Sequence, residues 1–130
     1  EVLGKNDSEI VKDVMKVLSL VTLEDKYRLF PLQLSAGEQQ RVSIARAIVG
    51  GPKILLADEP TGNLDPDTAG EILDILEEVN SIGTTVIMAT HNASLVNERK
   101  KRTVALDDGS IHSDEAKGRY HVGKKKHANA

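Results

Sequence analysis

The stretch ILLADEPTGNLD, residues 54 to 65, decides the fold of this chain. It begins with a short apolar run, Ile54 to Ala57, of the kind that forms a parallel strand buried on both faces. An acidic pair follows, and Pro66 then opens a segment to Asn80 in which apolar side chains recur at helical spacing. The apolar residues that we expect this helix to turn toward the core are Ile72, Leu73, Leu76 and Val79. A β-branched run from Thr84 to Ala89 comes next, so the sequence predicts an α/β fold with a parallel sheet flanked by helices.

Two helices are predicted on the amino-terminal side of this unit. Residues 8 to 21 carry apolar side chains at helical spacing, with Asp7 or Ser8 as the expected cap. A further helix is expected from about Ala36 to Val49, because Gly50-Gly51-Pro52 is a helix-ending cluster.

The carboxyl-terminal part is predicted to hold a short helix and a hairpin. Asn92 begins the helix, and the strands Thr103 to Leu106 and Ser110 to His112 flank the turn Asp107-Asp108-Gly109. Residues 114 to 130 end in a basic stretch, and we expect them to form a solvated, flexible tail.

Composition narrows the class of protein. With 130 residues, the chain has the size of one domain or of a piece of one. A net charge of −3 gives no global basic field of the kind that nucleic-acid binding requires. The absence of cysteine excludes disulfides and thiolate metal sites and suits a cytosolic protein. No apolar run approaches the roughly 20 residues of a membrane-spanning helix, so we expect any membrane association to come through a partner.

The stretch LSAGEQQR, residues 34 to 41, starts the helix expected from Ala36. Its Ser35 and Glu38 match a capping box, S-x-x-E, which alone requires no further function. A capped helix start also attracts anions, because its backbone N–H groups carry partial positive charge. Gly37 has no side chain to block a phosphate that approaches its amide. The same residues therefore predict a helix cap and a phosphate contact.

Together and in this order, LSAGEQQR and ILLADEPTGNLD resemble the signature loop and the Walker B strand with its D-loop in ATP-binding cassette (ABC) ATPases. By this resemblance, residues 1 to 34 belong to the helical subdomain. Residues 35 to 113 would form part of the RecA-like core of a P-loop NTPase, before the tail.

A usable phosphate-binding loop, G-x-x-x-x-G-K-[ST], does not occur in the sequence. The nearest match, Gly118 to Lys124, is followed by Lys125 where a serine or threonine should bind Mg²⁺. The chain also begins at Glu1 rather than Met. We therefore expect a C-terminal fragment of an ABC ATPase that lacks the Walker A loop and the Q-loop.

The resemblance implies roles in ATP hydrolysis for residues that follow the two strands. Asp58 would hold Mg²⁺, largely through water, as a hard cation prefers. Glu59 would be the general base for the attacking water. His91, after the second strand, would be the switch histidine that contacts the γ-phosphate. Asp65 before Pro66 is expected to cap a helix, and the resemblance adds a D-loop role at the nucleotide, between the two sites of a dimer.

The resemblance also implies that the signature residues bind the γ-phosphate of an ATP held by the opposite protomer. These residues are Ser35, Ala36, Gly37 and Glu38. Two of them depart from the usual LSGGQ, because Ala36 replaces a glycine and Glu38 replaces a glutamine. If Ser35 is the cap, Ala36 takes the first helical position, where φ is negative and a methyl group is tolerated. Glu38 fits the capping box, so neither change argues for an inactive site.

Within the family, EQQR after the signature and ADEPTGNLD resemble a group that includes lipoprotein-release, macrolide-efflux and cell-division ATPases. Residues 62 to 120 look most like the cell-division ATP-binding proteins of Gram-positive bacteria. This likeness implies an ATP- and Mg²⁺-dependent homodimer on the cytoplasmic face of the membrane, docked to an integral membrane partner and not to nucleic acid. The fragment alone is expected to be inactive.

Three other interpretations stay open. The chain could come from an exporter ATPase of the lipoprotein-release or macrolide type. It could come from a DNA-repair or chromosome-maintenance ATPase, which shares the signature serine and the acidic pair but carries long heptad arms. If residues 1 to 130 are the entire protein, it would be a non-catalytic binding module with minimal nucleotide affinity.

Overall fold

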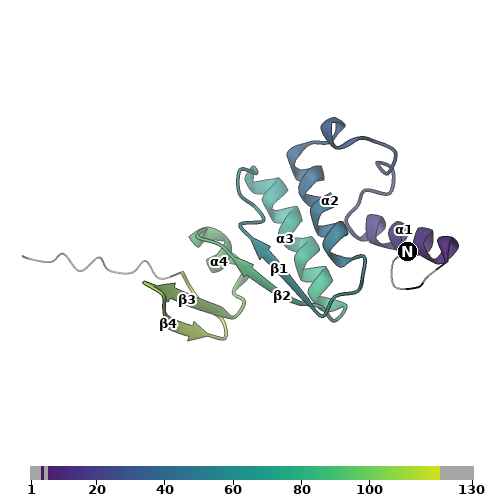
Figure 1. Ribbon diagram of the computed structural model, residues 1–130. Coiled ribbons are helices and arrows are strands. Elements are labelled where there is room, and N and C mark those ends of the chain that lie inside the picture. The colour runs from purple at the N-terminus through teal and green to yellow at the C-terminus, as the bar shows by residue number, and fades with distance from the viewer. Residues whose placement is uncertain (1–3, 5, 121–130) are drawn as a thin grey trace, which may run out of the picture. The chain divides into compact units, whose positions relative to one another are not determined.

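A computed structural model of the chain describes residue 4 and residues 6–120, in two compact units, Glu1–Thr90 and His91–Ala130 (Figure 1). In the first unit the described elements are α1 (Asp7–Leu20), the 3-10 helix η1 (Pro31–Gln33), α2 (Ala36–Ile48), β1 (Ile54–Asp58), α3 (Pro66–Ser81) and β2 (Thr85–Ala89). In the second unit they are α4 (Ala93–Arg99), β3 (Thr103–Asp107) and β4 (Ser110–Glu115). The predicted α/β fold with a parallel sheet and helices is confirmed.

The sheet of the first unit consists of β1 and β2, which pair in parallel from Ile54 with Thr85 to Asp58 with Ala89. Helix α3 makes the crossover between the two strands and packs against β2. Its buried side chains are Ala69, Ile72, Leu73, Ile75, Leu76 and Val79. Every residue that the sequence assigned to the core face of this helix is among them.

The prediction that the Ile54–Ala57 run is buried on both faces is wrong. Leu55 is buried, but the side chains on the other face of β1 are exposed, with Ile54 at 57% and Leu56 at 73% of their surface. Ile87 of β2 is exposed in the same way, at 54%. The reason is that α3 covers one face of the sheet, and the described residues of the first unit place no layer on the other.

Helix α1 begins one residue earlier than the sequence suggested. Its cap is Asn6 rather than Asp7 or Ser8, because Asn6 and Glu9 stand at the spacing of a capping box. The Asn6 side chain accepts from the Glu9 N–H at 3.0 Å, and Glu9 accepts from the Asn6 N–H at 3.1 Å.

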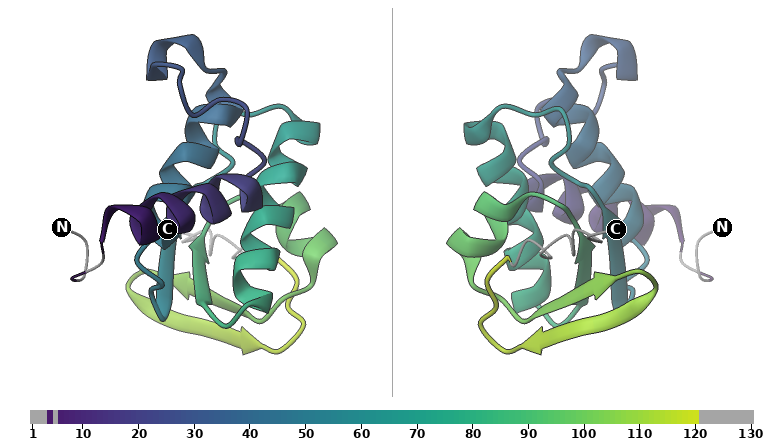
Figure 2. Two further views of the ribbon diagram at one scale, coloured as in Figure 1. Left: turned by 90° about the vertical axis from the view of Figure 1, so that its right-hand side faces the viewer. Right: turned by 90° about the vertical axis from the view of Figure 1, so that its left-hand side faces the viewer.

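Helices α2 and α3 lie side by side (Figure 1, Figure 2). Helix α2 ends at Ile48, within one residue of the predicted end. Gly51 then takes a left-handed φ of +65° and donates its N–H to the Ile48 carbonyl at 2.9 Å. This turn leads the chain from α2 into the sheet.

In the second unit, Asn92 caps α4 as predicted, since its side chain accepts from the Ser94 and Leu95 N–H groups. The β3–β4 hairpin is confirmed and is longer than predicted. Its turn residues, Asp108 and Gly109, have φ of +46° and +76°, as a two-residue type I′ turn requires.

The boundary of the expected tail also differs, because β4 continues to Glu115. Asp114 in this strand pairs with Arg102 at 2.8 Å. Gly118 is buried against Thr103, where a Cβ atom would overlap the threonine side chain. The rest of the predicted flexible tail, residues 121–130, lies outside the described residues. None of the helices in the described part of the chain has the length and apolar character needed to span a bilayer.

Candidate functional site

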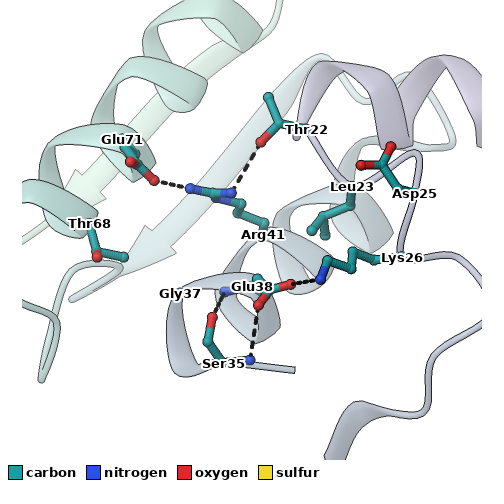
Figure 3. Close-up of a pocket in the computed structure, with 10 residues that line it drawn as sticks. All are labelled: Thr22, Leu23, Asp25, Lys26, Ser35, Gly37, Glu38, Arg41, Thr68 and Glu71. Carbon is teal, nitrogen blue, oxygen red and sulfur yellow. Dashed lines mark hydrogen bonds and ion pairs between the residues drawn. The ribbon is translucent and has the colours of Figure 1, made fainter. Parts of the chain in front are cut away.

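The start of α2 is a complete capping box (Figure 3). The Glu38 N–H donates to Ser35 Oγ at 3.2 Å, and the Ser35 N–H donates to Glu38 Oε1 at 3.3 Å. The N–H groups of Ala36 and Gly37 have no carbonyl acceptor within the helix, since they belong to its first turn. The predicted cap is confirmed, and these two N–H groups give it the positive potential of an anion site.

Glu38 brings a negative charge to this turn, and its neighbours balance that charge. Hydrogen bonds from the Ser35 side chain and then from its backbone lower the pKa of the Glu38 carboxyl, and the charges of Lys26 and Arg41 add to the effect. Lys26 Nζ lies 3.8 Å from Glu38 Oε2. Glu38 therefore stays ionised at neutral pH, with its carboxylate turned toward Lys26 and the Ser35 N–H (Figure 3).

Ala36 occupies the first helical position, as the sequence predicted. It is not among the residues with positive φ, so the alanine causes no backbone strain where the usual motif has glycine.

The acidic pair lies at the carboxyl end of β1. Asp58 is the last residue of the strand, and Glu59 turns the chain with a left-handed φ of +46°. Its N–H donates to the Ala89 carbonyl at 2.8 Å, and its Oε2 accepts from Thr90 Oγ1 at 3.2 Å. A non-glycine residue in this conformation costs on the order of 1–3 kcal/mol, and such residues cluster at active sites. Glu59, the residue that the sequence suggests as the general base, thus has a strained backbone of the kind found at active sites.

The loop from Glu59 to α3 is fixed by buried residues and by a hydrogen bond within the loop. Pro60 and Thr61 are buried, and the Gly62 N–H donates to the Glu59 carbonyl at 3.0 Å. Because this loop is short, the end of β1 and the start of α3 lie at the same end of the unit.

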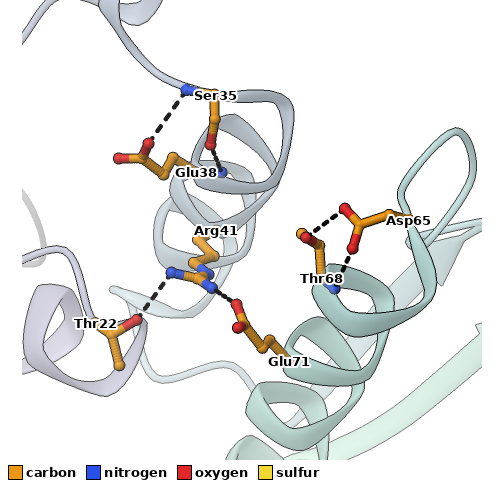
Figure 4. A network of polar contacts seen from close by, with 7 residues as sticks. All are labelled: Thr22, Ser35, Glu38, Arg41, Asp65, Thr68 and Glu71. Carbon is orange, nitrogen blue, oxygen red and sulfur yellow. Dashed lines mark hydrogen bonds and ion pairs between the residues drawn. The ribbon is translucent and has the colours of Figure 1, made fainter.

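Asp65 caps α3, which confirms the predicted cap. Its Oδ2 accepts from the Thr68 N–H at 3.1 Å, and its Oδ1 accepts from Thr68 Oγ1 at 2.6 Å (Figure 4). Both bonds lower the pKa of the Asp65 carboxyl, and the bond from the Thr68 side chain has the larger effect.

Helices α2 and α3 meet along a polar seam (Figure 4). Arg41 of α2 pairs with Glu71 of α3, and its other terminal nitrogen donates to Thr22 Oγ1 at 3.1 Å. One turn closer to the helix starts, Gly37 is buried against Thr68, where a Cβ atom would overlap the Thr68 methyl group. The two helix caps therefore lie at the same end of the α2–α3 pair.

A hollow of about 420 Å³ opens beside this seam, between α2, α3 and the turn after α1 (Figure 3). Both of its cationic side chains already face carboxylates, Arg41 with Glu71 and Lys26 with Glu38. We infer no separate anion site there.

For a metal ion, the described residues offer no cluster of three or more acidic or histidine side chains. Mg²⁺ in phosphate-transfer sites is held by one or two carboxylates together with water and phosphate oxygens. The exposed Asp58 at the end of β1 fits that requirement, and its predicted role stays a prediction.

His91 is the first residue of the second unit, exposed and directly before the Asn92 cap. Its predicted contact with a γ-phosphate stays a prediction.

Sequence reasoning missed three residues that support the site. Thr68 stands three residues after Asp65, a spacing that would have indicated a bond to the cap. Thr90 binds the Glu59 carboxylate, and nothing in the sequence marks it beyond its place after a strand. Glu71 pairs with Arg41 from a distant part of the chain, which no local pattern reveals.

The comparisons with known proteins agree with these features. The family model described as "ABC transporter" matches residues 2–62. The chain is 59% identical over 120 residues to the cell division ATP-binding protein FtsE of Bacillus subtilis, with 92% of the chain and 53% of that protein covered.

This chain belongs to the ABC ATP-binding protein family.

Two further relatives place it within the family. The chain is 55% identical over 120 residues to FtsE of Streptococcus pneumoniae serotype 2, covering 92% of the chain and 52% of that protein. A solved dimeric structure of a bacterial ABC transporter cassette aligns with a TM-score of 0.71 and 34% identity, over 90% of the chain and 51% of that structure. This member of the ABC family thus spans about half the length of the curated relatives it matches.

Proposed function

We propose that this chain provides the signature-loop and Walker B portions of an ATP-hydrolysing ABC subunit. The observation that carries the proposal is the common position of two helix caps at one end of the α2–α3 pair. The contact of Gly37 with Thr68 brings the Ser35 cap close to the start of α3, where Asp65 caps the helix. A short loop joins Asp65 to the acidic pair at the end of β1.

In this proposal Glu59 is the general base. Its carboxylate accepts the proton of the attacking water, while the Thr90 hydroxyl and the left-handed backbone hold it in one direction. Asp58, one residue earlier, would hold Mg²⁺ through water. The ion, when bound, supplies positive charge for the phosphate oxygens.

The signature turn acts on a second copy of the protein. The N–H groups of Ala36 and Gly37 and the Ser35 hydroxyl would bind the γ-phosphate of an ATP held mainly by the opposite protomer, with Glu38 keeping the turn in shape. Asp65 would transmit the state of one site to the other, and His91 would contact a γ-phosphate. The functional unit is therefore a homodimer with two ATP sites.

We further propose a role in bacterial cell division, as the ATPase of an FtsE–FtsX type complex on the cytoplasmic side of the cell membrane. The support is that relatives with 50–59% identity in several bacteria carry the name cell division ATP-binding protein FtsE. The integral membrane partner would be of the FtsX type. The names of these relatives do not favour the exporter alternative. Residues 1–130 alone should not hydrolyse ATP, because they contain no G-x-x-x-x-G-K-[ST] loop.

The test is Glu59→Gln in the full-length protein. The amide keeps the size and the hydrogen bond of the side chain but cannot take a proton, so turnover should fall by about 10²–10⁴-fold while ATP binding persists. Binding is measured by calorimetry and turnover by phosphate release.

Glu78→Gln is the matched control, since this exposed residue lies near the other end of α3. It should leave turnover near the wild-type value. Unchanged turnover in Glu59→Gln would remove Glu59 from the proposed role.

A further inference from the structure

Thr68 uses both branches of its side chain, and each branch contacts a different functional loop. Its hydroxyl donates to Asp65 Oδ1 at 2.6 Å, at the cap of α3. Its methyl group lies against Gly37 in the signature turn, where an added Cβ would overlap it. No other residue in the described seam bonds the D-loop cap and contacts the signature glycine.

The two contacts depend on one torsion angle. Rotation about the Cα–Cβ bond of a threonine moves its hydroxyl and its methyl group together, and a branched side chain has few allowed rotamers in a helix. A methyl group added at position 37 could be accommodated only if Thr68 rotated and left Asp65, or if α2 and α3 moved apart. Separation of the helices would strain the Arg41–Glu71 pair one turn away.

We infer that Thr68 is a positioning residue that couples the signature turn to the D-loop within one protomer. Gly37 is then required for internal packing against the Thr68 methyl group, in addition to any approach of a phosphate. The inference rests on the proposed function for the loops that it links. In the protomer, a displacement of the signature turn moves Thr68, and Thr68 moves the Asp65 cap.

The dimensions allow a direct test with complementary substitutions. A Cβ atom at position 37 would lie 3.9 Å from the Thr68 Cβ, an ordinary van der Waals distance. Serine at position 68 lacks only the overlapping methyl group and keeps the hydroxyl for Asp65. Thr68→Ser should therefore make room for Gly37→Ala. Valine at position 68 does the reverse, since it keeps the methyl group and removes the hydroxyl.

The experiment measures melting temperature and ATP turnover of the full-length protein in the variants Gly37→Ala, Thr68→Ser, Gly37→Ala/Thr68→Ser and Thr68→Val. Gly37→Ala should lower the Tm by roughly 2–10 °C, as expected for overpacking in a chain of 150–250 residues. It should also lower turnover about tenfold to a hundredfold through misplacement of the signature turn. The double variant should recover at least half of the Tm loss and most of the turnover.

Thr68→Val distinguishes a positioning role of Thr68 from a role in packing alone, because it keeps the methyl group and removes the hydroxyl. Its Tm should stay within about 2 °C of the Thr68→Ser value, while kcat falls severalfold with little change in KM, because Asp65 has lost its side-chain bond.

Two results would overturn the inference. One is a double variant that melts as low as Gly37→Ala, since the methyl overlap would then not be the reason for the glycine. The other is a Thr68→Val protein with wild-type kcat. If the wild-type protein hydrolyses no ATP, the proposed function fails, and the melting temperatures of the four variants alone decide whether Gly37 packs on Thr68.

Discussion

At the scale of single residues, the site is built from short polar side chains that fix backbone turns. Ser35 and Asp65 each accept the N–H three residues ahead, and Thr90 holds the Glu59 carboxylate. Glu59 itself stays in a left-handed conformation that an unconstrained glutamate rarely adopts. These contacts hold the candidate base and both caps in place before any nucleotide binds.

One consequence at this scale concerns pH. Hydrogen bonds from Thr68 place the pKa of the folded Asp65 carboxyl below its ordinary value of 3.8. Because the folded value is the lower one, the stability from this cap is complete above the ordinary pKa and is lost as the pH falls through the folded pKa. Thr68→Val should raise the pKa of Asp65 toward 3.8, so that the carboxyl contributes less stability above that pH and the loss is complete at a higher pH than in the wild type. Carboxyl-carbon NMR titration measures this value, with Thr68→Ser as the control that keeps the lowered pKa.

The residue scale also shows the limits of sequence reasoning. Ser35, Glu38 and Asp65 could be assigned as caps because a cap is local and depends on spacing along the chain. The cap at Asn6 is not predicted, although Asn6 and Glu9 have the spacing of a capping box, because Asp7 and Ser8 are also residue types that cap helices. The neighbour of Gly37 could not be predicted, because Thr68 lies in another helix and meets it only after packing.

At the scale of elements, the seam between α2 and α3 holds the Ser35 cap and the Asp65 cap at one end of the helix pair. The helices start at the same end, so a cap on one lies near a cap on the other (Figure 4). Helix periodicity predicted the buried face of α3 correctly, since burial repeats with the helical period. It could not predict the Arg41–Glu71 pair, whose partners are 30 residues apart in sequence.

The Arg41–Glu71 pair gives a prediction for the seam. Arg41 has 16% of its side chain exposed and Glu71 has 57%, so solvent screens the pair in part. Arg41→Ala and Glu71→Ala should each destabilise the protein, with a coupling energy of about 0.5–1 kcal/mol in a double-mutant cycle by urea denaturation. Glu71→Gln serves as the milder variant, because it keeps an acceptor for the guanidinium. Purely additive effects of the two alanine substitutions would show that the pair does not join the helices.

At the scale of the whole molecule, the parallel sheet is covered on one face only by the described residues of its own unit. Ile54, Leu56 and Ile87 are exposed on the other face, where the sequence had indicated a strand buried on both sides. The apolar run predicts a strand correctly, but burial of both its faces depends on a layer that the described residues of the first unit do not provide. The matched region covers 53% of the FtsE relative from Bacillus subtilis, so that relative has further polypeptide outside the match.

The central claim is that the Ser35 turn acts on an ATP held by the opposite protomer. The most direct measurement is sedimentation of full-length Glu59→Gln protein with Mg²⁺ and ATP, in the presence and absence of Ser35→Arg. Ser43→Arg, about two turns further along α2, is the matched control on an exposed position. The account predicts that Glu59→Gln forms an ATP-dependent dimer, alone or with Ser43→Arg, and that Ser35→Arg leaves a monomer that still binds ATP. A Ser35→Arg protein that dimerises normally, or that loses ATP binding as a monomer, would contradict it.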